Sequence, residues 1–279
     1  MEILTAHTVN PDTQQAVSEA LTQLLSTTDE NIDLLIVYYT EVHDAAVLRE
    51  ALVTALPRVE MHGCSSCQGV MSQRGFHSEQ GASLGLWAIL DDDGDYGTAA
   101  VPLSNNLAET GERAVAEAMA NAGRMGEVPE LIWFSSTPGY EETLIESIQG
   151  VVGNNVPIAG GSAADNTVAG NWSLFNASQS LQEGLVVTLL YPSVNTSSAF
   201  LSGYSPTETS GVVTKAQGRT IIEIDGKPAA QVYNDWIGSP FEPKILDQGG
   251  NVLADTTLYP LGREASVVAG VQQFKLSHP

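Results

Sequence analysis

The sequence predicts an α/β fold that contains the same unit twice, with two mixed sheets, flanking helices and a pseudo-twofold relation between the copies. Apolar runs typical of buried strands alternate with amphipathic stretches of helical period over the first 190 residues. The order of these elements occurs twice, with matching residues about 97 positions apart. From about residue 205 the pattern changes, which indicates a partial C-terminal α+β module.

The first copy is expected to span residues 1–95. Asn10 and Pro11 favour a helix start, because Asn is a good N-cap and Pro suits the first helical position. Pro57 is expected to end the second helix. The predicted order is strand 1–7, a helix after Pro11, strand 34–40, helix 43–56, strand 59–62, the polar turn 63–69 and strand 83–90.

The second copy is expected to span residues 96–190. AVSEAL at Ala16 matches AVAEAM at Ala114, which lies 98 positions later. GCSS at Gly63 matches GGSA at Gly160, which lies 97 positions later. The predicted order is strand 96–103, helix 108–123, strand 131–137, helix 141–152, strand and polar turn 156–166, and strand 183–190.

The duplicated part is assigned to a domain of residues 1–204, and residues 205–279 to the second module. This module begins with two predicted strands joined by a glycine-containing turn. A hairpin turn at Asp225-Gly226 and a short helix follow. Lys215, Arg219 and Lys227 gather here, in a chain poor in bases.

Charge limits the classes of partner. Eleven Lys and Arg residues face 33 Asp and Glu residues, for a net charge of −22. Such a surface repels nucleic-acid phosphates and anionic lipid, so we expect neither nucleic-acid nor membrane binding. No apolar run is long enough to cross a bilayer, and the N-terminus lacks a signal-peptide pattern. A cytoplasmic protein is therefore expected.

The two polar turns are the candidate binding site. They occupy the same place in both copies, after a strand whose carboxyl end is expected to face a ligand crevice. Small residues allow a ligand close to the backbone, while N–H groups take its oxygens and Asp165 takes an amine or orients a neighbour. The alternative is that both are tight turns that need glycine. The predicted lining of one shared cleft is Cys64, Ser65, Ser66, Cys67, Gly160, Gly161, Ser162, Asp165 and Asn166.

Both cysteines lie in the first turn and permit other chemistry. A structural zinc site needs a second pair of ligands, which the chain does not offer beside His62, Cys64 and Cys67. A thiol-dependent enzyme or a redox switch that uses Cys64 or Cys67 is the competing hypothesis, and it predicts a depressed thiol pKa. A third hypothesis is an interaction module whose cleft is filled by its own side chains.

Together these motifs resemble the FIST sensory domains. GCSSCQGVM, followed by GF and SLGLWAIL, resembles the family's G-C-S-T-x-G turn and next strand. PIAGGSAADN, followed by EGLVVTLL, resembles its P-x-x-G-G-S-A-x-D-x motif, and VTKAQGRTIIEIDGKPAAQVYN with LYPLG resembles the start of its C-terminal module. The chain departs from the family in having Cys67 and Gln68 where Ala and Gly are commoner, and in lacking the closing G-F-Y-x-x-G-E motif.

The resemblance implies an intracellular signal sensor without catalysis of its own. It implies a small-molecule ligand such as an amino acid. For a subset of the family it implies haem that responds to nitric oxide, with a histidine kinase or a cyclic-di-GMP enzyme as partner. As the ligand of a haem iron, His77 is the first choice because Phe76 adjoins it, and His62 is the second.

Overall fold

The computed structural model describes residues 1–28, 31–197, 203–250, 252, 256–268 and 271–278. The chain forms two compact units, Met1–Ala199 and Phe200–Pro279. Among the described residues, no helix is both long and apolar enough to span a membrane.

The first unit repeats one order of elements and confirms the predicted duplicated α/β fold. The first copy comprises β1 (Glu2–Thr8), α1 (Thr13–Leu25), β2 (Leu34–Thr40), α2 (Ala45–Ala55), β3 (Glu60–Ser66), β4 (Val70–Ser72), β5 (Gly75–His77) and β6 (Leu84–Leu90). The second copy comprises β7 (Asp95–Pro102), α3 (Leu107–Asn121), β8 (Leu131–Ser136), α4 (Glu141–Val152), β9 (Ile158–Ser162), β10 (Leu174–Asn176), β11 (Ser180–Leu181) and β12 (Gly184–Tyr191).

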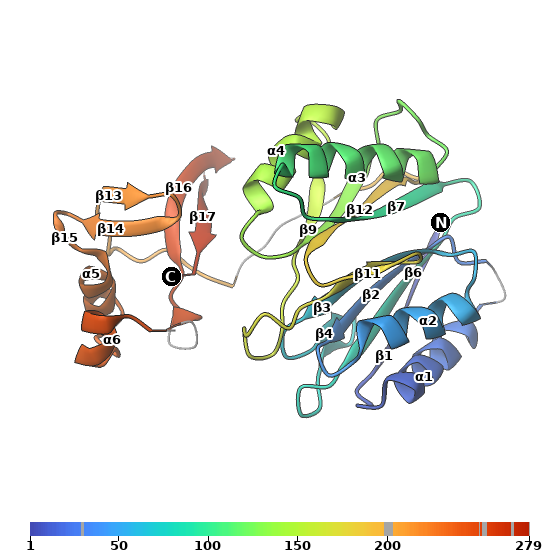
Figure 1. The fold of residues 1–279 in the computed structure, drawn as a ribbon, viewed down its shortest axis with the longest axis horizontal. Helices are drawn as coiled ribbons and strands as arrows, with labels where there is room; N and C mark the ends of the chain where they lie inside the picture. Colours follow the sequence, from blue (N-terminus) through green and yellow to red (C-terminus); the bar gives the residue numbers. More distant parts are fainter. Residues whose placement is uncertain (29–30, 198–202, 251, 253–255, 269–270, 279) are drawn as a thin grey trace. The chain divides into compact units, whose positions relative to one another are not determined.

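The elements form four layers (Figure 1). One sheet has the order β1-β6-β2-β3-β10-β11 and the other the order β7-β12-β8-β9, so the four main strands of each copy follow the same order. Helices α1 and α2 cover the outer face of the first sheet, and α3 and α4 cover that of the second. The inner faces of the two sheets pack against each other.

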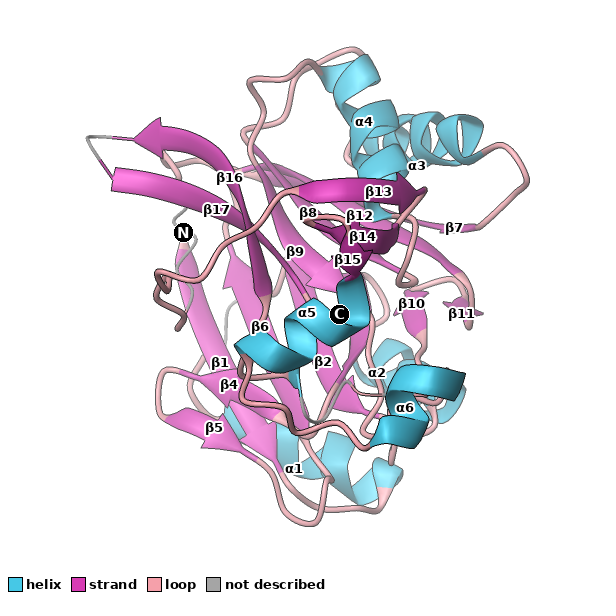
Figure 2. Cartoon of the chain, turned by 90° about the vertical axis from the view of Figure 1, so that its left-hand side faces the viewer, coloured by secondary structure: helices cyan, strands magenta, loops and turns pink. Residues whose placement is uncertain are grey.

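The copies differ in where their short hairpins go. Strand β10 leaves its own copy and pairs antiparallel with β3, with Leu174 opposite Cys64. The equivalent hairpin of the first copy, β4–β5, forms a separate sheet that lies against β1, β2 and β6 (Figure 2). The second copy therefore completes the sheet of the first, while β9 remains the last strand of its own sheet.

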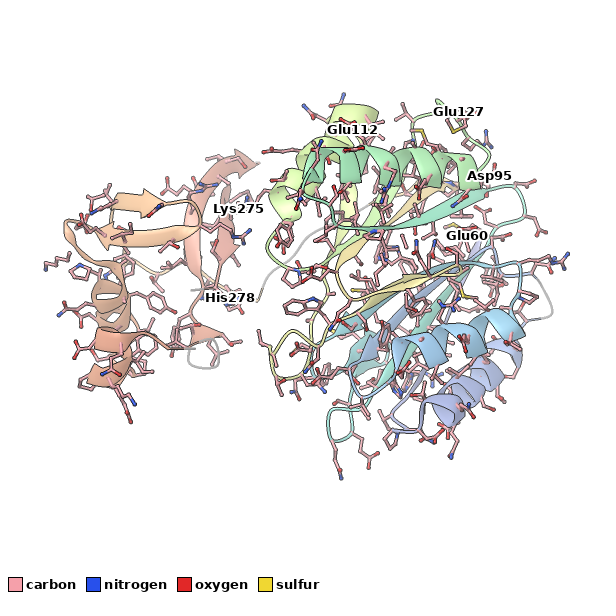
Figure 3. The ribbon with its side chains drawn as sticks, viewed as in Figure 1. Glu60, Asp95, Glu112, Glu127, Lys275 and His278 are labelled. Atoms are coloured by element: carbon pink, nitrogen blue, oxygen red, sulfur yellow. The ribbon has the colours of Figure 1, made fainter. Side chains whose placement is uncertain are left out.

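Aromatic and polar side chains fill the layer between the sheets. Trp87 of β6 meets Trp133 of β8 edge-on, with ring centroids 5.1 Å apart, and the Trp133 indole N–H donates to the Tyr38 hydroxyl at 3.1 Å. Glu60, labelled in Figure 3, accepts the Thr98 backbone N–H of β7 at 2.8 Å. Because burial removes water from this carboxyl, its pKa is raised although the Thr98 N–H opposes the shift.

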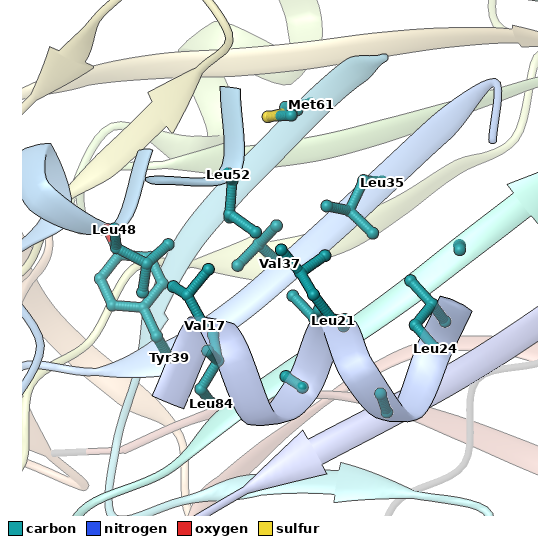
Figure 4. Packing of buried hydrophobic residues seen from close by; sticks show 14 of the residues in the cluster. Val17, Leu21, Leu24, Leu35, Val37, Tyr39, Leu48, Leu52, Met61 and Leu84 are labelled. Atoms are coloured by element: carbon teal, nitrogen blue, oxygen red, sulfur yellow. The ribbon is translucent and has the colours of Figure 1, made fainter. Parts of the chain in front are cut away.

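The outer cores are built mainly from aliphatic side chains. Every second residue of β2 points towards the helices, as the period of a strand requires, and these residues meet one face of α1 and α2 (Figure 4). The packing is close enough that the members of this cluster are almost completely buried. They include Val17, Leu21, Leu24, Leu35, Val37, Tyr39, Leu48, Leu52, Met61 and Leu84.

Two predicted helix starts were wrong by a few residues. Helix α1 begins at Thr13 and its N-cap is Asp12, whose carboxylate accepts the Gln15 N–H. Asn10 instead accepts the N–H of Asp12 at 3.0 Å, so it shapes the turn before the helix. Helix α2 begins at Ala45, because Asp44 caps two N–H groups of its first turn.

Strand β3 extends further than its predicted end at residue 62. It runs to Ser66 because β2 pairs with it through Thr40 and Ser66 on one side, while β10 supplies partners on the other. Cys64 and Ser65 therefore belong to the strand, and the turn itself starts at Cys67.

The second unit contains the predicted strands, turn and helix. Strands β13 (Val213–Gln217), β14 (Thr220–Ile224) and β15 (Lys227–Pro228) form an antiparallel sheet followed by helix α5 (Ala229–Trp236). Asp225 and Gly226, both with positive φ, make the hairpin turn. Helix α6 (Pro243–Gln248) and the hairpin β16 (Leu261–Val268) and β17 (Val271–Ser277) follow.

Candidate functional site

The two polar turns meet in the structure. The Ser65 carbonyl accepts the Ala164 N–H at 3.0 Å. Gln68 and Asn166 bond twice, from the Gln68 N–H to Asn166 Oδ1 at 2.6 Å and from Gln68 Nε2 to the Asn166 carbonyl at 2.8 Å. The two copies are thus joined directly at the place where the sequence predicted a shared site.

This place is set by the parallel strands. Strands β2 and β3 run parallel and end together at Thr40 and Ser66, and β8 and β9 end together at Ser136 and Ser162. After β3 the chain turns through Gln68, whose φ of 64° is uncommon for a residue with a side chain. The carboxyl ends of all four strands therefore surround the paired turns.

Only some of the predicted site residues can touch a ligand that arrives from solvent. Cys67, Gly160, Gly161 and Ser162 are exposed, and Ser66 and Asn166 are half-buried. A further three are almost completely buried, namely Cys64, Ser65 and Asp165.

Asp165 holds its own loop together. Its carboxylate accepts backbone N–H groups from Thr167 (2.9 Å), Ala169 (3.0 Å), Gly170 (2.7 Å) and Asn171 (2.7 Å). Burial raises its pKa, but these donors outweigh burial and leave the pKa below its usual value. Of the two predicted roles for Asp165, this geometry favours orienting neighbours over contact with an amine.

The thiols show the reverse of activation. Burial raises the pKa of Cys64 to about 12. The pKa of Cys67 is also raised, first by partial burial and then by the negative charges of Asp165 and Glu41. Both are free thiols, and both are in the protonated, weakly nucleophilic form at neutral pH.

His62 is a core residue between the sheets. It is completely buried, with Nδ1 2.9 Å from the Thr188 hydroxyl and Nε2 2.9 Å from the Ser135 hydroxyl. Burial lowers its pKa to about 3, so the ring is neutral. Both nitrogens are occupied, and this side chain does not fit an axial haem ligand.

His77 also lacks the surroundings of a haem ligand. Its Nε2 lies 2.7 Å from the Ser72 hydroxyl, and its ring stacks on His7 at 3.5 Å. Phe76 is 61% exposed and forms no apolar wall. In the described part of the chain, no group of three or more His, Cys, Asp or Glu residues is arranged to hold a metal ion.

A cavity of about 510 Å³ lies at the carboxyl ends of β1 and β2, beside the paired turns. None of the predicted turn residues lines it. Its nearest link to them is Asn166, whose Nδ2 donates to the Gly81 carbonyl at 3.0 Å. The lining residues, which the sequence reasoning missed, are Thr8, Val9, Asn10, Pro11, Glu19, Val42, Glu79, Gln80 and Ala82.

Two acidic side chains of the lining differ in their partners. Glu19 accepts bonds from Thr8 and Asn10, which lower its pKa. The Glu79 carboxylate has no hydrogen-bond or ion-pair partner among the described residues. Next to Val42, Glu41 Oε2 is buried and likewise finds no partner within the described ranges. The rule that ligands bind beyond the carboxyl ends of strands, applied to β1 and β2 as well, would have found these residues.

Comparison with known proteins supplies the family. The FIST N domain family matches residues 33–227. The chain belongs to this family. It thus carries a sensor domain for small ligands, and the FIST resemblance of the turn motifs is confirmed, whereas the haem subset is not.

Two further similarities are limited in extent. An uncharacterized protein of Methanocaldococcus jannaschii is 32% identical over 78 residues, which are 28% of this chain and 15% of that protein. The chain therefore spans only a small part of the length of this relative. The solved structure of a cyanuric acid hydrolase from A. caulinodans aligns at 10% identity with a TM-score of 0.34, covering 68% of this chain and 66% of the hydrolase.

Proposed function

We propose that the first unit of this FIST protein senses a small metabolite of amino-acid type and binds it in the 510 Å³ cavity at the ends of β1 and β2. The observation that carries the proposal is the Glu79 carboxylate, which lines the cavity and has no partner among the described residues. The ammonium group of an amino acid would satisfy it.

The chemistry of the lining favours such a ligand. An ammonium group donates three hydrogen bonds, and charge-assisted bonds to carboxylates are among the strongest in proteins. Glu19 supplies a second carboxylate, and the amide of Gln80 supplies donors for the ligand's carboxylate. Val9, Val42 and Ala82 add apolar surface for a side chain. A few polar groups within an apolar surface are typical of small-molecule sites.

The paired turns would then transmit binding. Gln80, which lines the cavity, is followed by Gly81, whose carbonyl accepts a hydrogen bond from Asn166 of the second copy. Asn166 in turn accepts the N–H of Gln68 in the turn of the first copy. Gln80 and Gln68 both have left-handed φ values, 52° and 64°, which raise the energy of this conformation. A ligand that binds one arrangement of the loop better than another shifts the population of both turns.

We further propose that the protein relays this change rather than catalyses a reaction, and that its partner is a histidine kinase or a cyclic-di-GMP enzyme in the cytoplasm. The raised pKa values of both thiols support sensing over thiol chemistry. Haem with nitric oxide is not part of the proposal, because the contacts of His62 and His77 do not fit an iron ligand.

The test is a thermal-shift screen of the twenty amino acids, followed by calorimetric titration of the hits. Glu79→Gln is expected to weaken binding by about tenfold or more, since it removes a charge-assisted bond. Glu112→Gln, which changes an exposed carboxylate of α3 outside the cavity, is the matched control. Saturable binding that Glu79→Gln leaves unchanged, or no binding of any amino acid at millimolar concentration, would refute the proposal.

A further inference from the structure

A second cavity, of about 280 Å³, lies at the outer edge of β1. Strand β1 is the last strand of its sheet, and the cavity lining comes from β1, from the end of α1 and the residues after it, and from the β4–β5 hairpin. Its lining includes hydroxyl groups of Thr5, Thr27 and Ser72, the amide of Gln23, and the side chains of His7 and Arg74. None of the described residues that line it carries a carboxylate.

The charge of this pocket is opposite to that of the chain. Acidic residues outnumber Lys and Arg by 33 to 11, and several arginines lie beside carboxylates. Arg124 is an example, with Asp95 at 2.6 Å and Glu127 at 3.0 Å. The Arg74 guanidinium forms no ion pair and no hydrogen bond with the described residues. It thus retains all five N–H donors beside a pocket lined with hydroxyls.

Two stacked imidazoles lie close to the Arg74 charge. The His7 and His77 rings stack with centroids 3.5 Å apart and planes inclined by 17°. Ser72 fixes the pair, since its hydroxyl lies 2.7 Å from His77 Nε2. The pKa of His7 is lowered, first by partial burial and then by the positive charges of His77 and Arg74. The protein thus gathers three groups that repel one another when protonated, and an anion among them would relieve this repulsion.

We propose that this pocket binds the oxyanion group of a small molecule, with Arg74 as the charged contact and His7 and Ser72 as hydrogen-bonding contacts. An Arg guanidinium matches the spacing of two oxygens on a phosphoryl or carboxylate group. The pocket shares no lining residue with the 510 Å³ cavity, so this proposal is independent of the amino-acid proposal.

The experiment is calorimetric titration of the full chain with inorganic phosphate and, separately, with succinate, at constant ionic strength set with chloride. Saturable binding is expected. Arg74→Gln should weaken it by about tenfold or more, and His7→Asn should also weaken it. Arg58→Gln, which alters another exposed arginine that does not line the pocket, should leave it unchanged. Melting curves identify a variant that has lost its fold.

The two titrants separate the sources of the oxyanion. Tighter binding of phosphate assigns the pocket to phosphorylated molecules, and tighter binding of succinate assigns it to carboxylates. Absence of saturable heat with both at 10 mM, roughly the weakest affinity that such a bond would give, would overturn the proposal. Binding that Arg74→Gln and Arg58→Gln weaken equally would also overturn it, because only nonspecific charge would then be at work.

Discussion

Protonation of His62 is expected to destabilise the first unit in acid. The ring is completely buried, and burial lowers its pKa from 6.5 to about 3. In the unfolded chain His62 therefore becomes protonated below about pH 6.5, whereas in the folded chain it stays neutral down to about pH 3. The contribution of His62 is fully present above pH 6.5 and is lost as the pH falls towards 3. Each pH unit in between costs about 1.4 kcal/mol, so the loss at pH 5 is about 2 kcal/mol relative to pH 8.

The assay compares the wild type with His62→Gln by urea unfolding at pH 8, 7, 6 and 5, followed by tryptophan fluorescence. Trp87 and Trp133 report on the same layer between the sheets. The variant loses bonds to Ser135 and Thr188, so at pH 8 it should be less stable by roughly 2 kcal/mol. At pH 5 the difference should almost vanish, because only the wild type carries the penalty of His62.

Other histidines do not confound the comparison. His7 and His43 also have lowered pKa values, but both remain in the variant and contribute equally to the two proteins. If the difference in unfolding free energy between wild type and variant stays constant from pH 8 to pH 5, His62 is not held neutral, and the argument about the layer between the sheets fails.

Three further changes test the loop and the thiols. Asp165→Asn should lower the free energy of unfolding by about 2 kcal/mol at neutral pH, because it removes charge-assisted bonds to backbone N–H groups. Since the folded pKa of Asp165 is lowered, the difference in stability between wild type and variant should shrink as the pH falls below about 4, and a difference that persists there would contradict this account. Val168→Gly should raise stability by about 1 kcal/mol, because a β-branched residue at φ 55° is strained, and a lower melting temperature would show that the side chain contributes more than the strain. With iodoacetamide at pH 7.5, mass spectrometry should find Cys67 modified slowly and Cys64 unmodified, and fast modification of either would revive the thiol hypothesis.

The main elements of the fold could be predicted because each has a local cause. The apolar run 34–40 predicts β2, which lies at the expected residues, and the helical period of the apolar residues predicts α1, which begins at Thr13 rather than at Pro11. The duplication followed from matched letters such as Ala16 and Ala114. The sheet that the β10–β11 hairpin joins could not be predicted. Strand β10 pairs with β3, over 100 positions earlier, and nothing in the sequence of the hairpin indicates that partner.

The candidate site was predicted in part, for a similar reason. The recurrence of GCSS and GGSA showed that the two turns are equivalent, and the structure joins them through Gln68 and Asn166. Residue type alone could not show which side chains are accessible. Cys64 has the sequence surroundings of a turn residue, but it lies in an extended strand between β2 and β10. The Asp165 carboxylate accepts hydrogen bonds from its own loop. The unpartnered Glu79 has no motif around it, and only its place beside the cavity distinguishes it.

The pairing of β10 with the sheet of the first copy couples the two copies of the duplicated domain. If each copy completed its own sheet, the two copies would contact each other only through the layer between the sheets. The strand ends of each copy could then bind a ligand independently of the other copy. Because β10 pairs with β3, the loop that Asp165 holds must cross from β9 to the other sheet. Asn166 lies on this crossing and bonds both Gln68 and Gly81 of the first copy. The loop that carries Gln80 is therefore hydrogen-bonded directly to a residue of the second copy.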